Sequence, residues 1–461
     1  MENTEILPGF QATRESVASK IDIFFDSVSL SRLASACGIS KNKGVSAKKL
    51  LMMLFTMPFL GTNIYRATVC NTDCDFGKDV VYDFLGSHRF SWRRLLLMVA
   101  LKVTSMLDTL TTEDRETVLI LDDTSVHRPR AKKVELLARV YDHAEKKFIK
   151  GFRLLTLAWS DGASLVPIDF ALLSSTNPSN RYQGVLKQLD RRTCGARRRR
   201  EAVTKSTSLL APMVQRTLET GVKARYLLMD SWFGMPAIIA SLRHLLPVIC
   251  MIKRTPTVLY GFNGKRLSAE GIFREVKKRR GRAKILSNAV VTMNDGEQAR
   301  IVFVRDRKKK DWLALLCTDL NLSEEDIVRI YGKRWDIEVF FRTTKQFLEL
   351  EKGSQARDFD TLIAHSTIVF LRYIFLALEQ RKKADPRSLG LLFHACCEEM
   401  RDVTYIESLK RIIELAAIEI LPNHPVHAEI YNALAEAMVG QAIRYFGLDG
   451  SNYQRSQAKA A

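Results

Sequence analysis

Cysteine and histidine are scarce in this sequence, which has eight of each among 461 residues. The cysteine spacing gives no disulfide framework for a chain of this size, so the pattern of a disulfide-stapled secreted domain is excluded. Cys70 and Cys74 are close enough to suggest zinc, but no Cys/His pair follows at zinc-finger spacing, and no histidine lies in a ligand motif. Buried or unused thiols are therefore expected.

Long apolar runs free of charge are also missing. The longest strongly apolar stretches are residues 50–60, which are too few to cross a bilayer, and residues 362–378, which include His365 and Arg372. Both are interpreted as buried helices. The first five residues are Met-Glu-Asn-Thr-Glu and lack the basic and then apolar pattern of a signal peptide, so a cytoplasmic protein is expected.

Acidic residues are in deficit. The 51 Asp and Glu residues face 71 Lys and Arg, which gives a net charge of +20 and a pI near 9.6. A polyanion is the natural partner of such a chain, and nucleic acid or an anionic membrane surface would both satisfy it. The hydrophobic share of 46% is that of a globular protein, and the length indicates roughly two to four structural units.

Residues 330–345 carry an unusual arrangement of polar side chains. If they form a single helix, Tyr331, Arg334 and Lys345 all fall within about 40° of Glu338, because successive residues are about 100° apart. A carboxylate can hold a divalent metal, whereas arginine, lysine and tyrosine can bind phosphate. The alternative is a solvated face on which Arg334 and Glu338 form an ordinary i,i+4 ion pair.

Two apolar runs upstream of this stretch end in acids. Residues 117–121 precede Asp122 and Asp123, and residues 224–229 precede Asp230. Each run reads as a buried strand, and open α/β sheets carry their chemistry at the carboxyl ends of strands. Of the first pair, Asp122 is expected to be the functional acid, and Asp123 is the second candidate. A solvated turn after the strand would also suit the acidic pair.

The spacing of Tyr331, Arg334, Glu338 and Lys345, with two, three and six residues between them, resembles the Y-R-E-K signature of IS4-type (Tn5-like) DDE transposases of bacterial insertion sequences. The neighbouring Arg-Trp-x-Ile-Glu run is similar to that family as well. The resemblance implies that Tyr331, Arg334 and Lys345 hold DNA phosphates near the transposon end, inside the bacterial nucleoid.

The acids upstream resemble the other motifs of the same family. Asp122-x-Thr124 is similar to its first acidic motif, and Asp230-x-Trp-Phe-Gly is similar to its second. The resemblance implies a ribonuclease-H-like core in which Asp122, Asp230 and Glu338 are catalytic and bind Mg²⁺, with Mn²⁺ as a substitute. The implied activity is metal-dependent cleavage of transposon ends followed by strand transfer into target DNA.

The implied partner is double-stranded DNA, both terminal inverted repeats and target, bound by a homodimer in the synaptic complex, with no membrane. The alternatives are a ribonuclease-H-fold nuclease without strand transfer and an inactive or domesticated DNA-binding protein. The presence of all three acids argues against the inactive form.

Two further features carry expectations about DNA contact. Residues 188–205 are expected to form a loop whose arginines, Arg197, Arg198, Arg199 and Arg200 among them, either contact the DNA backbone or belong to a disordered basic linker. Trp312, at the start of an apolar strand, resembles in its position the base-stacking tryptophan of the family. The alternative for Trp312 is packing in the core or at a sheet edge.

The sequence predicts an α/β protein with five segments. They are a helical N-terminal DNA-binding region (1–110), the first part of a ribonuclease-H-like core (111–246), a β-rich insertion (247–318), the second part of that core with the Y-R-E-K helix (319–382) and a helical C-terminal region with a role in dimerisation (383–461). In the first segment, a helix up to Cys37 and a second from Ser46 resemble a helix-turn-helix, although an ordinary helical hairpin has the same pattern.

Overall fold

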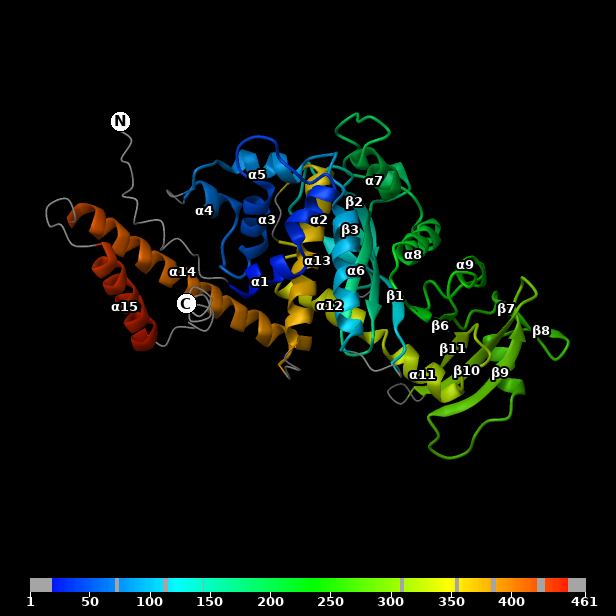
Figure 1. Ribbon diagram of the computed structural model, residues 1–461. Helices are drawn as coiled ribbons and strands as arrows, with labels where there is room; N and C mark the ends of the chain where they lie inside the picture. Colours follow the sequence, from blue (N-terminus) through cyan, green and yellow to red (C-terminus); the bar gives the residue numbers. More distant parts are fainter. Residues whose placement is uncertain are drawn as a thin grey trace.

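The computed structural model describes residues 19–70, 74–110, 115–143, 145–306, 311–352, 356–382, 387–420 and 428–446. Helices from both ends of the chain gather on one side, a mixed sheet runs through the middle, and a β-rich part lies at the opposite end (Figure 1). The sequence also predicts a basic loop at residues 307–310 and an interruption of the C-terminal helices at residues 421–425, and both segments lie outside the described residues.

The core part of the sheet consists of β1 (Val118–His127), β3 (Lys147–Ser160), β4 (Leu165–Leu173), β5 (Tyr226–Met229) and β6 (Val248–Ile252). β3 is antiparallel to β1 and to β4, whereas β1, β5 and β6 run parallel. One strand, an antiparallel hairpin and two further parallel strands make the ribonuclease-H-like arrangement that the sequence predicted. The fold class is thereby confirmed.

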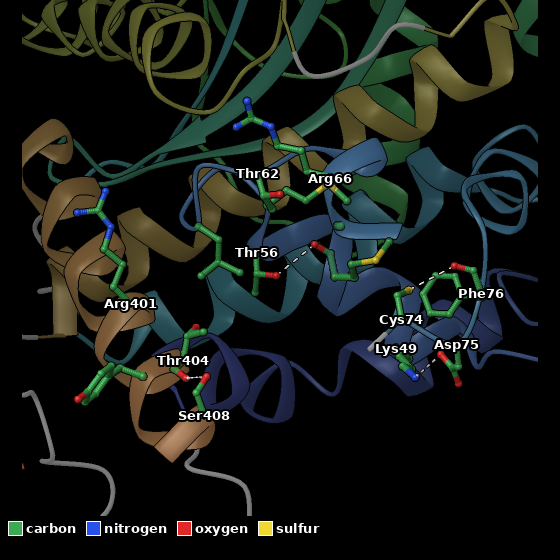
Figure 2. Close-up of a pocket in the computed structure, with 15 residues that line it drawn as sticks. Lys49, Thr56, Thr62, Arg66, Cys74, Asp75, Phe76, Arg401, Thr404 and Ser408 are labelled. Carbon is green, nitrogen blue, oxygen red and sulfur yellow. Dashed lines mark hydrogen bonds and ion pairs between the residues drawn. The ribbon is translucent and has the colours of Figure 1, made fainter. Parts of the chain in front are cut away.

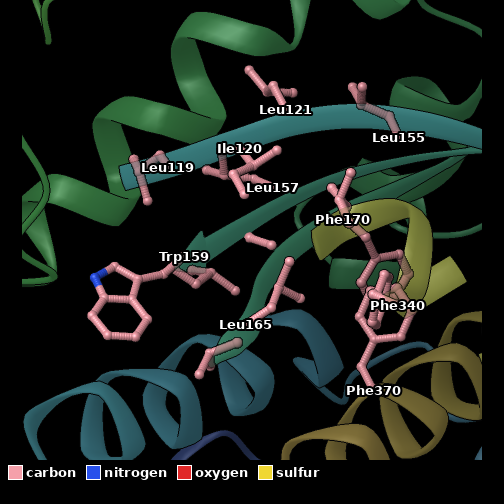
Figure 3. Close-up of a cluster of buried hydrophobic side chains, with 14 of the residues drawn as sticks. Leu119, Ile120, Leu121, Leu155, Leu157, Trp159, Leu165, Phe170, Phe340 and Phe370 are labelled. Carbon is pink, nitrogen blue, oxygen red and sulfur yellow. The ribbon is translucent and has the colours of Figure 1, made fainter. Parts of the chain in front are cut away.

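Continuous apolar runs explain why these strands are buried. All nine residues of β4 are buried, as are the first four of β1, because helices cover the sheet. Figure 3 shows leucines of β1 and β3 in the same buried cluster as Phe170 of β4. The ring of Phe170 meets that of Phe370, and Phe370 meets Phe340, so rings from two helices reach the sheet. The β3–β4 turn falls at Asp161 and Gly162, where Gly162 has φ +88°, a conformation that glycine adopts without strain.

The covering helices include α6 (Trp92–Asp108), α12 (Trp335–Gln346) and α13 (Phe359–Lys382), all of which pack on β4. In the part of the chain that the structure describes, residues 359–381 are long and apolar enough to cross a membrane, but their most apolar window is entirely buried. Arg372 within this helix donates to the backbone carbonyls of Phe55 and Leu348. This is the buried helix expected at residues 362–378.

The β-rich insertion extends the sheet and does not form a separate layer. It comprises β7 (Leu259–Phe262), β8 (Lys265–Ser268), α10 (Ala269–Glu275), β9 (Ile285–Thr292), β10 (Gln298–Asp306) and β11 (Asp311–Cys317). β11 pairs antiparallel with β6, so the sheet continues from the core into the insertion. β6, which the sequence placed with the insertion, also pairs in parallel with β5 and thus joins the two parts.

The remaining elements are helices around this sheet and one short strand. The N-terminal helices are α1 (Lys20–Ser27), α2 (Leu30–Ala36), α3 (Ala47–Thr56), α4 (Ile64–Thr68) and α5 (Lys78–Leu85). β2 (Ala138–Asp142) pairs with the first part of β3. α8 (Leu210–Glu219) and α9 (Pro236–Leu242) flank β5, and α14 (Leu389–Ile420) and α15 (Ala428–Phe446) form the C-terminal hairpin at the left of Figure 1. All eight cysteines are free, as expected.

Candidate active site

Two parallel strands bring the first two acids together. β1 and β5 pair in parallel with Leu121 opposite Met229, so the next residue of each chain segment, Asp122 and Asp230, are neighbours at the same edge of the sheet. The Oδ1 atom of Asp230 accepts a hydrogen bond from the backbone nitrogen of Trp232 at 2.9 Å, a local turn that fixes the carboxylate.

The third acid comes from two helices joined by a tight turn. α11 (Glu324–Gly332) ends before α12 begins at Trp335, and the backbone nitrogens of Lys333 and Arg334 donate to carbonyls three residues back. The expectation of one uninterrupted helix over the Y-R-E-K residues is therefore corrected. This turn is tighter than a turn of α-helix. The direction of Tyr331 relative to Glu338 therefore does not follow from the 100° per residue of an ideal helix.

Arg334 links two of the expected catalytic acids. Its Nη1 donates to Oδ2 of Asp122 at 2.9 Å, and its Nη2 donates to Oε1 of Glu338 at 2.6 Å. Asp123, the reserve candidate, is bonded instead to Arg153 of β3. The structure thus gathers Asp122, Asp230 and Glu338 at one place, from the middle of β1, the end of β5 and α12. The expectation that Asp122 lies at the end of its strand is corrected, because β1 stays paired with β3 as far as His127.

The environment of Asp122 is unfavourable for a lone negative charge. Burial raises the pKa of Asp122 to about 7, and the charge of neighbouring Asp230 adds to the rise, while Arg334 opposes it. Burial likewise raises the pKa of Asp123 against the effect of Arg153. Carboxylates crowded in this way are stabilised by a further cation. The oxygen donors of Asp122, Asp230 and Glu338 fit a hard ion such as Mg²⁺ or Mn²⁺.

Tyr331 lies beside these acids with an unsatisfied polar group. Its hydroxyl is buried and has no hydrogen-bond partner among the described residues. Burial raises the pKa of Tyr331 well above its usual range, so the hydroxyl stays protonated and can donate to a bound oxygen atom. Lys345, at the far end of α12, lies 3.6 Å from Glu351 and not at the acids.

The arginine-rich segment differs from its expectation. Residues 188–205 are not one loop, because α7 (Cys194–Ala202) forms there with Thr193 as its N-cap. Arg198 and Arg199 are 6% and 5% exposed and pair with Asp360 of α13. These two side chains are therefore corrected from DNA contacts to structural ion pairs, whereas Arg197 and Arg200 are exposed.

Trp312 is half-buried in an aromatic cluster of the insertion. Its ring stacks on Phe273 with centroids 4.4 Å apart and meets the edge of Phe303 at 5.2 Å. The guanidinium of Arg254 lies 4.6 Å from its centroid. A flipped base would have to displace one of these neighbours to stack on Trp312.

Several residues near the acids were not singled out from the sequence. Arg153, which neutralises Asp123, is 30 residues away along the chain, and only the pairing of β1 with β3 brings it close. Further along β1, ligand atoms of His127, Asp142 and Glu145 lie within 4.8 Å of one another and could hold a metal ion. In each case only the folded structure brings the residues together, and their spacing in the sequence matches no motif.

A cavity of about 720 Å³ lies away from the acids, between α3, α4 and α14 (Figure 2). Lys49, Arg66 and Arg401 contribute cationic groups to it, and Lys49 is paired with Asp75. None of the acids of the candidate active site lines this cavity.

Two families of known proteins match overlapping parts of this chain. A family described as DDE superfamily endonuclease matches residues 63–310, more than half of the chain, and includes Asp122 and Asp230. A second family, described as archaeal putative transposase ISC1217, matches residues 287–385, which include Glu338. No curated protein matches.

Among solved structures, the NurA nuclease from Sulfolobus solfataricus aligns over 55% of this chain and 78% of its own, at 12% identity and a TM-score of 0.23, too low for any inference. The matched family covers the strands that carry two of the three converging acids. The chain therefore belongs to the DDE superfamily of endonucleases.

Proposed function

We propose that this protein is a DNA transposase of an insertion sequence, of the IS4 type, which cleaves transposon ends and joins them to target DNA. The observation that carries the proposal is the convergence of Asp122, Asp230 and Glu338 around Arg334. The net charge of +20 supports a nucleic acid partner. The match to a transposase family over residues 287–385 supports transposition over simple cleavage.

Asp122, Asp230 and Glu338 would hold the metal ions. DDE superfamily endonucleases typically use divalent metals, and when bound, a metal pair supplies charge stabilisation to the attacking and leaving oxygens of a phosphodiester. Among the protein's own groups, Arg334 and Tyr331 would donate to phosphate oxygens, a role supported by the cationic group of Arg334 beside the acids and by the unpartnered hydroxyl of Tyr331. No serine, cysteine or tyrosine nucleophile is required.

The DNA substrate is double-stranded and comprises the element's ends and a target. Arg197 and Arg200, exposed on α7, and Lys345 of α12 are proposed as phosphate contacts outside the acid cluster. A homodimer that holds two ends together is proposed for strand transfer. The competing function, a nuclease without strand transfer, predicts cleavage of single ends but no joining of paired ends to a target plasmid.

The test of the acid cluster uses Asp122→Asn, Asp230→Asn and Glu338→Gln. Each change removes a metal ligand without altering the basic surface, so cleavage should fall by about 100-fold or more while duplex binding is retained. The substrate is the DNA that flanks the protein's own gene, assayed with Mg²⁺ for cleavage and with EDTA for binding. Asp190→Asn, which alters an exposed carboxylate paired only with Arg192 in the described chain, serves as the matched control. Normal cleavage by any of the three variants would overturn the assignment of that acid.

A further inference from the structure

Four exposed aromatic rings, from β2, β3 and the turns that follow β2 and β5, form a continuous strip beside the acids. Phe148 and Tyr141 are opposite each other in the β2–β3 pair, with ring centroids 5.2 Å apart. Tyr141 is 5.0 Å from His143, and His143 is 5.0 Å from Trp232. Their exposure is high for large rings, at 55% for Phe148, 41% for Trp232 and 37% for Tyr141. We call these four residues the aromatic strip.

Cations line the aromatic strip along its length. The guanidinium of Arg139 lies 4.1 Å from the ring centroid of Phe148. At the other end, Nζ of Lys253 lies 4.4 Å from the centroid of Trp232. In the part of the chain that the structure describes, neither Arg139 nor Lys253 has a carboxylate partner within ion-pair distance. Their charges are therefore available to an anionic ligand that lies along the rings.

The aromatic strip ends at the acid cluster. Trp232 follows Asp230 by two residues, and its backbone nitrogen donates to the Asp230 carboxylate. His143 lies 3.5 Å from Arg153 through its Nε2, and Arg153 is bonded to Asp123. A ligand held on the rings would thus reach the place where Asp122, Asp123 and Asp230 lie.

We propose that the aromatic strip binds the unpaired bases of a single DNA strand as it enters or leaves the acid cluster. Exposed rings interleaved with free cations suit a strand of single-stranded DNA, because bases stack on the rings while phosphates meet the cations. Bases inside a duplex are stacked on one another and cannot lie on protein rings, so the ligand must be unpaired. This inference rests on the proposed function, since it names the form of DNA that the acid cluster handles.

The geometry places this role on Trp232 and not on Trp312. Trp312 is half-buried and already stacked on Phe273, whereas Trp232 is exposed and adjoins an acid of the cluster. The sequence feature that pointed to Trp312 was its position before an apolar strand. The sequence did not indicate that Trp232 adjoins other exposed rings, because those rings come from β2 and β3, which are remote in sequence.

The test is binding of a fluorescein-labelled oligothymidine to the full chain in EDTA, followed by anisotropy. Trp232→Ala should weaken this affinity by roughly tenfold or more, while Trp232→Phe should stay near the wild type because a ring remains. The slope of log affinity against log salt should be unchanged in Trp232→Ala. In Lys253→Ala it should become shallower by about 0.7, the value for one phosphate contact to a single strand.

Two controls separate this role from general damage. Tyr445→Ala removes an aromatic side chain that is 85% exposed on α15, far along the chain, and should leave oligothymidine affinity unchanged. Affinity for a blunt duplex should be the same in Trp232→Ala and the wild type. Equal oligothymidine affinity for Trp232→Ala and the wild type would overturn the proposal, as would a parallel loss of single-strand and duplex binding.

The measurement needs neither metal nor cleavage, so its result is separate from that of the acid cluster. If the acid variants cleave normally but Trp232→Ala binds weakly, the proposed catalytic assignment fails and the strip stands. If the acid variants behave as expected and Trp232→Ala binds as the wild type, only the strip fails.

Discussion

At the scale of single residues, Arg334 shows how one guanidinium can pair with two carboxylates of the candidate active site. The sequence placed it near Glu338 as a phosphate-binding residue, and the structure adds its bond to Asp122 on a different element. Since Asp122 lies in a site that raises its pKa to about 7, this ion pair offsets part of the repulsion from Asp230. A divalent cation bound by Asp122 and Glu338 would compete with Arg334 for the same oxygens.

Trp312 gives a residue-scale prediction that decides between packing and base stacking. Because its ring stacks on Phe273 and meets Phe303, Trp312→Ala should reduce the free energy of unfolding by about 3 kcal/mol. Urea denaturation is the measurement. Leu313→Ala, a change at the neighbouring side chain that is 41% exposed, should cost much less.

The opposite result would favour the role expected from the sequence. If Trp312 stacks an extruded base, Trp312→Ala should keep its stability and its nicking of the first strand, and slow only the later step. A 2-aminopurine base placed beside the cleavage site would then change its fluorescence in the wild type alone.

The three acids could be found from the sequence because each follows a local pattern. Asp122 and Asp230 each follow an apolar run, although β1 continues past Asp122 to His127, and Glu338 lies at a fixed spacing from Tyr331 and Arg334. Arg153 could not be found in this way, because the only link between it and Asp123 is the pairing of two strands 30 residues apart. Local pattern therefore predicts the proposed ligands of such a site, whereas their neighbours depend on the fold.

At the scale of elements, α7 shows why a basic run was mistaken for a loop. The segment has four consecutive arginines and few apolar side chains, so no hydrophobic periodicity indicates a helix. The structure stabilises it through partners that are distant in sequence. Arg199 binds Glu135 in the loop before β2 and Asp360 of α13, both of which are buried.

This pairing predicts that two adjacent arginines contribute very differently to the free energy of unfolding. Arg199→Ala leaves the buried carboxylates of Glu135 and Asp360 short of a partner, so the free energy of unfolding should fall by about 3–5 kcal/mol. Arg200→Ala, at an exposed side chain, should change it by less than about 0.5 kcal/mol. Urea denaturation of the two variants is the direct comparison.

Duplex binding tests the other proposed role, that of Arg200 as a DNA contact. If Arg200 contacts a phosphate, Arg200→Ala should make the slope of log affinity against log salt shallower by about 0.9. An equal, small stability loss in both variants would contradict the structural role of Arg199, and an unchanged salt slope would leave Arg200 without a DNA contact.

At the scale of the whole molecule, the sequence predicted a ribonuclease-H-like core with a β-rich insertion, but it did not predict that β6 belongs to the core or how the insertion attaches. The sequence predicts a strand before Asp122, a hairpin over residues 152–173 that turns at Asp161-Gly162 and a strand before Asp230, because each has a local pattern. The pairing of β11 with β6 joins segments that local patterns do not relate, and it makes the insertion a continuation of the sheet. The α11–α12 turn was missed for a similar reason, because residues 324–346 contain no proline to mark a break.

The buried helix α13 makes the stability of the whole molecule sensitive to acid. His365 on this helix is 8% exposed, and its Nε2 lies 3.0 Å from the carbonyl oxygen of Glu349. Burial, reinforced by the charges of Arg128 and Arg372, lowers the pKa of His365 to about 3 from the ordinary 6.5. Between these values the unfolded chain binds more protons at this residue than the folded chain does, so stability is full above pH 6.5 and is lost as the pH falls toward 3.

His365→Gln isolates this contribution, because its amide can still donate to the Glu349 carbonyl but does not titrate. We expect the free energy of unfolding of the wild type to fall more steeply than that of His365→Gln between pH 6.5 and pH 4, by up to about 1.4 kcal/mol per pH unit. Urea denaturation at constant ionic strength, repeated at each pH, measures the two slopes. The variant should be less stable than the wild type at pH 7 if the amide fits the site less well, but only the difference in slope bears on the proton. Identical slopes for the two proteins would mean that His365 takes up its proton in the folded and unfolded chains alike, and that the acid sensitivity of this core arises elsewhere.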